Sequence, residues 1–233
     1  MAARLRRMRS PVLAELLALV APPACAACRG PRPAATGPLC RGCRSQLPWL
    51  RGPCCPRCAL PAGCAPCPAR TAAFDRAWSP LAYAGSARDL VGALKLAGAR
   101  EVAWEMAGHI VATAPAGLLD GAVLVPVPAH PRRRRRRGFD PPAVLARELA
   151  RRGAGGVRGA LRRRGPATRQ RGAGRSERLA PGRIALEATG PVPARVVVVD
   201  DVHTTGATFD AAARALRAAG ARDITALAYA RTL

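Results

Sequence analysis

The chain has 233 residues, which is enough for one well-packed core with a smaller module beside it. It carries 38 basic and 14 acidic residues and a formal net charge of +24, which predicts salt-dependent attraction to phosphates and nucleic acids. No apolar run of about 18 residues occurs, so we expect no membrane-spanning helix.

An apolar stretch at residues 11–20 follows a cluster of arginines, an arrangement that is also found in signal peptides. Glu15 in the middle of the stretch and the helical spacing of Val12, Leu16 and Leu19 favour a short amphipathic helix instead. We therefore expect a cytoplasmic protein.

Nine cysteines follow, and eight of them form four Cys-x-x-Cys knuckles. Two knuckles supply the four thiolates of a tetrahedral zinc site, so four knuckles predict two structural Zn²⁺ ions. Thiolate ligands need a reducing compartment, which favours zinc in the cytoplasm over a disulfide-rich fold. The predicted ligands are Cys25, Cys28, Cys40, Cys43, Cys55, Cys58, Cys64 and Cys67.

The sequence leaves the pairing of the knuckles open. A sequential arrangement joins the first knuckle to the second and the third to the fourth. The short segment between Cys58 and Cys64 also allows an interleaved arrangement. Cys54 is the ninth cysteine, and it could replace Cys55 as a ligand.

After the cysteines, the pattern predicts a strand at 74–81 and a helix within 83–98. Lys95, near the end of this helix, is the only lysine of the chain. This indicates either chance or a need for a compact ammonium group. A second helix is predicted at 101–114, and the residues expected to face inward are Trp104, Met106 and Ile110.

A buried strand at 122–128 runs into a proline-locked loop and six consecutive arginines. A run of like charges is typical of a solvated, disordered segment, which is the expectation for most of residues 132–137. Arg137 is the exception, because it lies before Gly138 and a helix predicted at 143–152, where a guanidinium can be held against a phosphate.

Four valines at 196–199 predict a strand that is buried on both faces, in the middle of a parallel sheet. The strand is expected to end in Asp200 and Asp201. A loop of small hydroxylated residues follows, then a helix at 209–220 and a final strand at 224–229.

The loop at 204–208 has the chemistry of a sugar-phosphate site. Free N–H groups at a helix N-terminus favour an anion, and the threonine hydroxyls add hydrogen bonds to phosphate oxygens. Asp200 and Asp201 suit sugar hydroxyls or a metal ion. The whole pattern resembles the phosphoribosyl pyrophosphate (PRPP) motif of type I phosphoribosyltransferases, in which the position of His203 is variable, so this side chain is expected to face solvent.

Further short motifs occur in the order found in one family: Tyr83-Ala-Gly85, Leu94-Lys95, Val125-Pro126-Val127-Pro128 and Arg137-Gly138-Phe139. Together with the knuckles and the PRPP motif they resemble the ComF competence family. This resemblance implies a helix and double zinc ribbon over residues 1–70. It also implies an α/β domain over residues 71–233, with a phosphoribosyltransferase-like parallel sheet flanked by helices.

The resemblance also implies that PRPP binds with Mg²⁺, with the loop from Val127 to His130 holding the pyrophosphate. Asp200 and Asp201 take the catalytic role. The remaining candidate binding residues are Thr204, Thr205, Gly206, Ala207, Thr208, Val127, Pro128, Ala129, His130, Lys95 and Arg137.

Two positions depart from the family pattern. Asp140 follows Arg-Gly-Phe, and Pro181 lies near the end of the segment 153–184, where asparagines are usual. Both bear on the pocket for the acceptor, which the sequence does not identify. The segment itself is predicted to be a mobile loop over the site, with Thr168-Arg-Gln170 and 175–178 similar to the family.

Two functions are expected from these patterns. The first is transfer of ribose 5-phosphate from PRPP to an acceptor, in connection with competence, DNA uptake or repair. The alternative is a non-catalytic module that binds a nucleotide or single-stranded DNA, with a competence helicase as a further partner.

Overall fold

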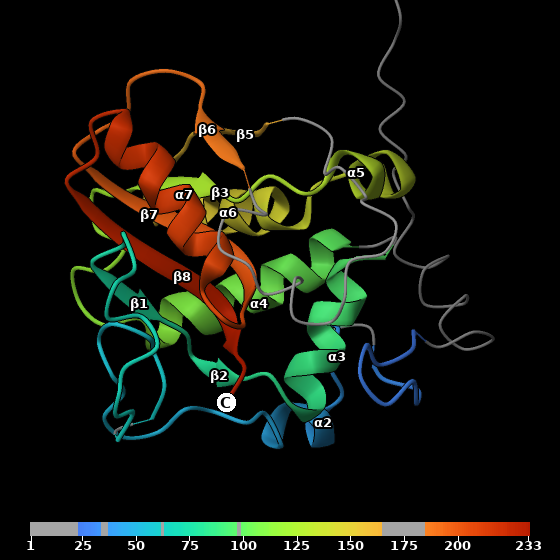
Figure 1. Ribbon diagram of the computed structural model, residues 1–233. Helices are drawn as coiled ribbons and strands as arrows, with labels where there is room; N and C mark the ends of the chain where they lie inside the picture. Colours follow the sequence, from blue (N-terminus) through green and yellow to red (C-terminus); the bar gives the residue numbers. More distant parts are fainter. Residues whose placement is uncertain (1–22, 34–36, 62, 97–98, 165–184) are drawn as a thin grey trace, which may run out of the picture.

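A parallel sheet runs through the middle of the molecule in the order β1–β8–β7–β3–β4, and β2 also pairs with β8 (Figure 1). The computed structural model describes residues 23–33, 37–61, 63–96, 99–164 and 185–233. The strands of this sheet are β1 Arg76–Trp78, β2 Leu81–Ala82, β3 Val123–Pro126, β4 Gly156–Val157, β7 Arg195–His203 and β8 Asp223–Arg231.

Strand β7 is buried on both faces, as its four valines predict. Val197 and Val199 belong to one hydrophobic cluster, and Val196 and Val198 belong to the other. This division follows from the two-residue period of a strand, which sends alternate side chains to opposite faces. Its place between β3 and β8 confirms the prediction of a central parallel strand.

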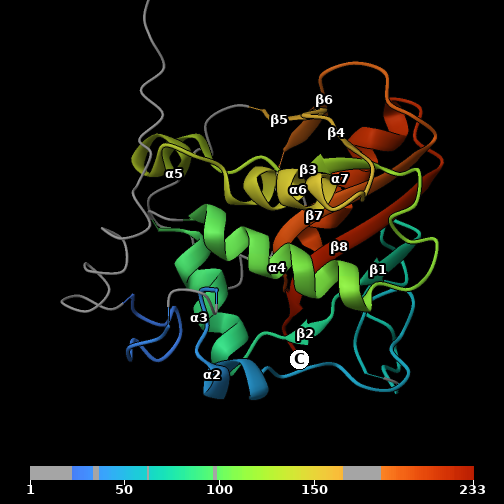
Figure 2. The same cartoon turned by 180° about the vertical axis from the view of Figure 1, so that it is seen from behind.

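Helices cover both faces of the sheet. On one face lie α3 Gly85–Leu94, α4 Ala99–Thr113 and α6 Pro141–Arg151, which are in front in Figure 2. The other face carries α7 Ala207–Ala218 and the antiparallel pair of β5 Leu161–Arg163 and β6 Leu186–Ala188 (Figure 1). The mixed α/β fold with a parallel central sheet is therefore the predicted one.

The two halves of the cysteine module pack against different faces of this sheet. Cys25 and Leu39, beside the short helix α2 Arg41–Ser45, belong to the cluster of α3, α4 and α6. Cys58 and Ala59 belong to the cluster of α7. The module thus contributes to both cores. The division of the chain at residue 70 stays a prediction.

Some elements differ from their predicted form. The strand expected at 74–81 is divided into β1 and β2 by a bend at Ser79 and Pro80. In α4, Met106 and Ile110 are buried, but Trp104 is 52% exposed. Residues 104 and 106 lie about 200° apart around a helix, so they cannot share one face.

The arginine run is helical rather than disordered. His130 caps α5, Pro131–Arg137, by accepting from the N–H of Arg132, and Pro131 provides a favourable first position. The arginines at 132–136 are exposed, so the prediction of a solvated charge run is confirmed for them. No helix in the part of the chain that the structure describes is long and apolar enough to cross a membrane.

The segment expected to be a loop at 153–184 contributes β4 and β5 before residue 165. The many glycines and arginines of this segment give it few apolar residues, which favoured a loop in the sequence. Strands as short as β4 and β5 can form with few buried side chains. The helix predicted at 11–20 and the positions 168–170, 175–178 and 181 lie outside the described residues.

A substitution on the α4–α6 side tests the main core. Leu149 of α6 is fully buried, so Leu149→Ala should lower the free energy of unfolding by about 2–5 kcal/mol. Leu96→Ala, at a leucine that is 54% exposed, is the matched control and should change it by less than about 0.5 kcal/mol. Urea unfolding followed by circular dichroism measures both, and equal losses would contradict this packing.

Candidate functional site

The ends of β3 and β7 place two candidate loops side by side. The strands pair in parallel as far as Pro126 and Val199, and the N–H of Val127 donates to the carbonyl oxygen of Val199 at 2.9 Å. The loop at 127–130 therefore begins next to Asp200. Carboxyl ends of parallel strands are where ligands bind in open α/β sheets.

Strand β7 continues beyond the two acids to His203, which corrects the prediction that it ends at Asp200 and Asp201. Pairing with β8 continues through Asp200 to His203, because the partner strand is equally long. The N–H of Asp201 donates to Asp200 Oδ1 at 2.8 Å. Burial and the negative charge of Asp201 raise the pKa of Asp200 well above its ordinary value.

Lys95 reaches this pair of acids from α3. It is the residue directly after the helix, and its Nζ lies 2.9 Å from Asp201 Oδ2. About a third of the lysine side chain is exposed, compared with 14% for Asp201. The only lysine of the chain is thus placed at the two acids that precede the threonine loop.

The threonine loop joins β7 to the N-terminus of α7. Thr204 and Thr205 are exposed, and the N–H of Ala207 donates to Thr205 Oγ1 at 3.4 Å. Gly206 precedes the helix with φ 83°, a backbone conformation that favours glycine. A Cβ at this position would also lie 3.0 Å from His203 Nε2. The N–H groups of Ala207 and Thr208 are in the first turn of α7, the favourable end for an anion.

His203 is buried, which corrects the expectation that it faces solvent. Its ring lies edge-on to Phe209, with centroids 5.1 Å apart, and to Phe74 at 6.1 Å. Burial, together with the charge of Arg231, lowers the pKa of His203 to about 4, so the ring is neutral at pH 7. The His203 ring packs close to Gly206 of the threonine loop.

The loop at 127–130 is held by side chains from two other segments. The N–H of Ala129 donates to Asp140 Oδ2 at 2.8 Å, and Arg163 Nε donates to the carbonyl oxygen of Pro128, also at 2.8 Å. Arg137 ends α5 and is half-buried, but its side chain forms no hydrogen bond or ion pair with another described residue. The structure therefore joins every candidate segment except Arg137 by direct contact or strand pairing.

Two residues of this site were missed as site residues by the sequence analysis. Arg163 is half-buried, and although burial lowers its pKa, the negative charges of Asp200 and Asp140 oppose the shift. Burial raises the pKa of Asp140, whose Oδ1 is buried without a hydrogen-bond partner among the described residues. Arg163 lies in a run of three arginines, so its sequence carried no signal that separates it from its neighbours.

The eight knuckle cysteines form two four-thiol clusters in the sequential pairing. One contains Cys25, Cys28, Cys40 and Cys43, and the other contains Cys55, Cys58, Cys64 and Cys67. Within each cluster the sulfurs lie within 4.8 Å of one another, and all nine cysteines are free. Cys54 belongs to neither cluster.

The spacing of the sulfurs fits zinc. A tetrahedral ion with Zn–S bonds of about 2.3 Å places its ligands about 3.8 Å apart. The Sγ atoms of Cys28 and Cys40 are 3.8 Å apart, as are those of Cys55 and Cys67. Each cluster would hold one structural Zn²⁺.

Arg231 connects the second cluster to the threonine loop. It is 4% exposed, and its Nε donates to the carbonyl oxygen of Cys58 at 2.8 Å. Its Nη1 donates to the carbonyl oxygens of His203, at 2.8 Å, and Thr204. One side chain therefore holds a zinc knuckle and the backbone at the start of the loop.

The sequence matches the double zinc ribbon domain family over residues 16–75. This match agrees with the two four-cysteine clusters. No curated protein matches the sequence significantly. The chain therefore has an N-terminal double zinc ribbon beside its α/β core.

The zinc content of cysteine variants tests which cysteines are metal ligands and whether Cys54 is one of them. The wild-type chain should contain two zinc ions, and Cys67→Ser should lower the content to one, because it removes a ligand from the second cluster only. Cys54→Ser is the matched control and should keep both ions. Inductively coupled plasma mass spectrometry on the purified full chain measures the ratio. A loss of zinc from Cys54→Ser would overturn the assignment.

Proposed function

We propose that the carboxyl edge of the sheet binds PRPP with Mg²⁺ and transfers its ribose 5-phosphate to an acceptor. The observation that carries the proposal is the ion pair of Lys95 and Asp201 beside the threonine loop. This contact brings together an acid for the sugar hydroxyls and a cation for the pyrophosphate. The N-terminus of α7, which suits the 5-phosphate, follows along the chain after the threonine loop.

Each part of PRPP has matching groups in this proposal. Asp200 and Asp201 accept hydrogen bonds from the ribose hydroxyls. The N–H groups and hydroxyls of the loop at 204–208 hold the 5-phosphate. The backbone of the loop at 127–130, with Lys95 and Arg163, holds the pyrophosphate.

The reaction replaces one bond at C1 of the ribose. The bond from C1 to the pyrophosphate oxygen breaks, pyrophosphate leaves with the bonding electrons, and a nucleophile of the acceptor forms the new bond. Mg²⁺, which Asp200 or Asp201 would hold together with the substrate phosphates, would supply charge stabilisation. Lys95 and Arg163 supply fixed positive charge for the leaving group.

Calorimetric titration tests the ribose-phosphate site. PRPP should bind the wild-type chain in the presence of Mg²⁺, and Asp200→Asn/Asp201→Asn should weaken binding at least about 100-fold, because the lost hydrogen bonds to charged groups each contribute about 1.5–3 kcal/mol. Asp89→Asn, at an exposed acid of α3, is the matched control and should bind like the wild type.

Absence of binding at millimolar PRPP would overturn the proposal. Once binding is established, release of pyrophosphate in the presence of a candidate acceptor would show that the chain catalyses the transfer and would identify that acceptor. Resemblance to the ComF family supports a role of this site in DNA uptake or repair.

A second function, binding of single-stranded DNA without turnover, is favoured by the exposed arginines of α5. Helix α5 directly follows the loop at 127–130, so DNA bound to its arginines would lie next to the proposed PRPP site.

The affinity for oligo(dT) at several salt concentrations tests this function. Binding should weaken steeply with salt, and Arg133→Ser/Arg135→Ser should reduce the slope of log K against log salt by about 1.4. Arg88→Ser/Arg158→Ser, at two exposed arginines away from α5, is the control and should leave the slope unchanged. Displacement of oligo(dT) by PRPP would place both ligands on one site, and an unchanged slope in the α5 variant would exclude α5 as the DNA contact.

A further inference from the structure

One of the two four-cysteine clusters lies on the same face of the sheet as the helix that follows the threonine loop. Phe209 of α7 shares a hydrophobic core with the ligands of this second cluster, which are Cys55, Cys58, Cys64 and Cys67. Cys25 of the first cluster belongs to the opposite core, under α3, α4 and α6. The second cluster is therefore the metal site on the side of α7.

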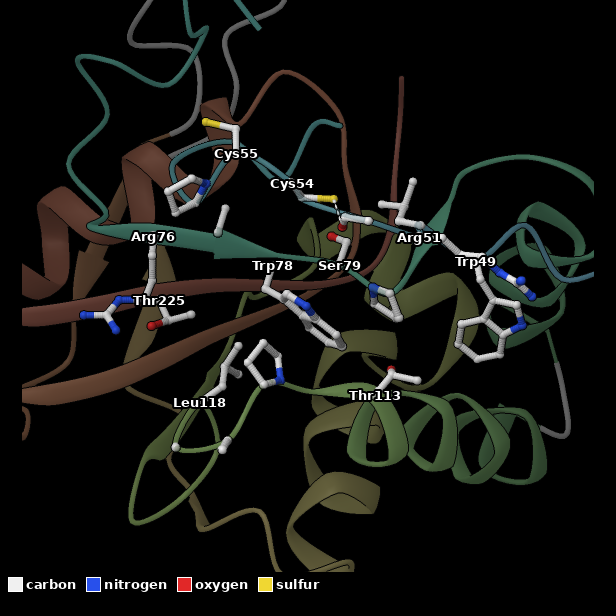
Figure 3. A pocket seen from close by; sticks show the side chains of 18 of the residues that line it. Trp49, Arg51, Cys54, Cys55, Arg76, Trp78, Ser79, Thr113, Leu118 and Thr225 are labelled. Atoms are coloured by element: carbon white, nitrogen blue, oxygen red, sulfur yellow. Dashed lines mark hydrogen bonds between the residues drawn. The ribbon is translucent and has the colours of Figure 1, made fainter. Parts of the chain in front are cut away.

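Hydrogen bonding fixes the position of the second cluster on the sheet. The N–H of Ala77 in β1 donates to the carbonyl oxygen of Pro56, which lies between the ligands Cys55 and Cys58, at 2.8 Å. Cys55 is next to this strand in Figure 3, and its sulfur points away from that of Cys54, which belongs to neither cluster. The knuckle at 55–58 is therefore attached to the same sheet whose strand β7 leads into the threonine loop.

Arg231, at the end of β8, connects this knuckle to the start of the loop. Its buried side chain donates to the carbonyl oxygen of Cys58 through Nε and to those of His203 and Thr204 through Nη1. A buried guanidinium that loses an acceptor is left with unsatisfied donors, at a cost in free energy. A displacement of Cys58 would therefore also disturb the contacts that Arg231 makes with the loop.

A second set of contacts leads from the same knuckle to the first turn of α7. Arg57 lies between two ligands, and its guanidinium donates at 2.7 to 3.0 Å to the carbonyl oxygens of Ala69, Ala72, Phe74 and Asp75. In the same segment, the N–H of Ala73 donates to Asp210 Oδ1 at 2.7 Å. The backbone on both sides of the threonine loop is thus connected to residues beside the zinc ligands.

The first cluster has its ion pairs on the other face of the sheet. Arg44, next to the ligand Cys43, pairs with Glu105 of α4, and Arg32 pairs with Glu101 of the same helix at 2.8 Å. Loss of an ion from the first cluster would therefore affect α4 before it affected the threonine loop.

Zinc would hold the knuckle at 55–58 in one conformation. The ion keeps four thiolates together, so the free energy of metal binding stabilises the folded arrangement around it. A fixed knuckle gives Arg231 a fixed acceptor at Cys58 and gives Arg57 a fixed position. The contacts of both arginines then depend on the ion.

We propose that the second zinc cluster positions the threonine loop through Arg231, so that occupancy of this cluster, and not of the first, determines the affinity of the loop for its ligand. Arg231 is a positioning residue, because it acts on the loop backbone. The inference rests on the proposed function only in the choice of PRPP as the ligand.

Hydrogen exchange at single amides of the full chain, followed by NMR, tests the positioning without a ligand. The N–H of Asp210 reports on the loop, because it donates to the carbonyl oxygen of Gly206 at 2.8 Å. The N–H of Ala154 is the reference on the other face, where it donates to the carbonyl oxygen of Leu149 at 3.1 Å. Exchange at the two amides separates a local effect from a global one.

Cys67→Ser removes a ligand of the second cluster and should speed exchange at Asp210 about tenfold or more, with Ala154 changed less than about twofold. Cys28→Ser, which removes a ligand of the first cluster, is the matched control and should leave Asp210 unchanged. Each variant should retain one zinc ion by mass spectrometry. Equal acceleration at both amides, or equal effects of both variants at Asp210, would overturn the proposal.

Substitutions of Arg231 test the connection itself. Arg231→Met should keep both zinc ions and speed exchange at Asp210 about tenfold or more, and Arg231→Lys should restore part of the protection, because an ammonium group keeps some of the donors. Combined with Cys67→Ser, Arg231→Met should speed exchange by less than the product of the separate effects, since both remove one contact. A full product, or no effect of Arg231→Met, would overturn Arg231 as the connection.

Calorimetry with PRPP and Mg²⁺ tests the consequence for the site. Cys67→Ser and Arg231→Met should weaken binding about tenfold or more, and Cys28→Ser should bind like the wild type. Equal affinity in all variants would overturn control of the site by the second cluster. Absence of binding to the wild type would overturn the proposed function, and the exchange measurements would then decide the positioning by themselves.

Discussion

The burial of β7 on both faces is the constraint on which the other parts of the structure depend. Its alternate valines complete two cores, one under α3, α4 and α6 and one under α7. One half of the zinc ribbon packs against each core. A shift of one residue in β7 would exchange the side chains of the two cores, so the register of this strand is strongly specified.

The same strand also determines where the candidate site is formed. Its acids come to one edge with the end of β3, and α3 brings Lys95 to them across more than 100 positions of sequence. The site therefore consists of groups that have no local relation and that only the sheet brings together. Lys95 forms an ion pair with Asp201, and the positive charge of Arg163 lies near Asp200. The residues on both sides of Gly206, at the N-terminus of α7, are exposed to solvent.

Short-range regularity explains what the sequence could predict. The valines of β7 and the Cys-x-x-Cys knuckles are patterns that lie within a few residues of sequence. A buried strand and a metal site could be predicted from them, because both require fixed local spacing. The burial of His203 was not predictable from local spacing, since besides the nearby Phe209 it involves Phe74, more than 100 residues away. Arg163 was hidden for a different reason: in a chain this rich in arginine, composition does not distinguish a half-buried guanidinium from a solvated one.

Arg231 also affects the electrostatics of the threonine loop. A zinc ion with four thiolates carries a net charge of about −2, which would repel a phosphate bound nearby. Arg231 donates to the backbone of Cys58 and of Thr204, so its positive charge is placed between the second cluster and the loop. With zinc in the cluster, it would act as a counter-ion between the metal centre and the candidate anion site at the threonine loop.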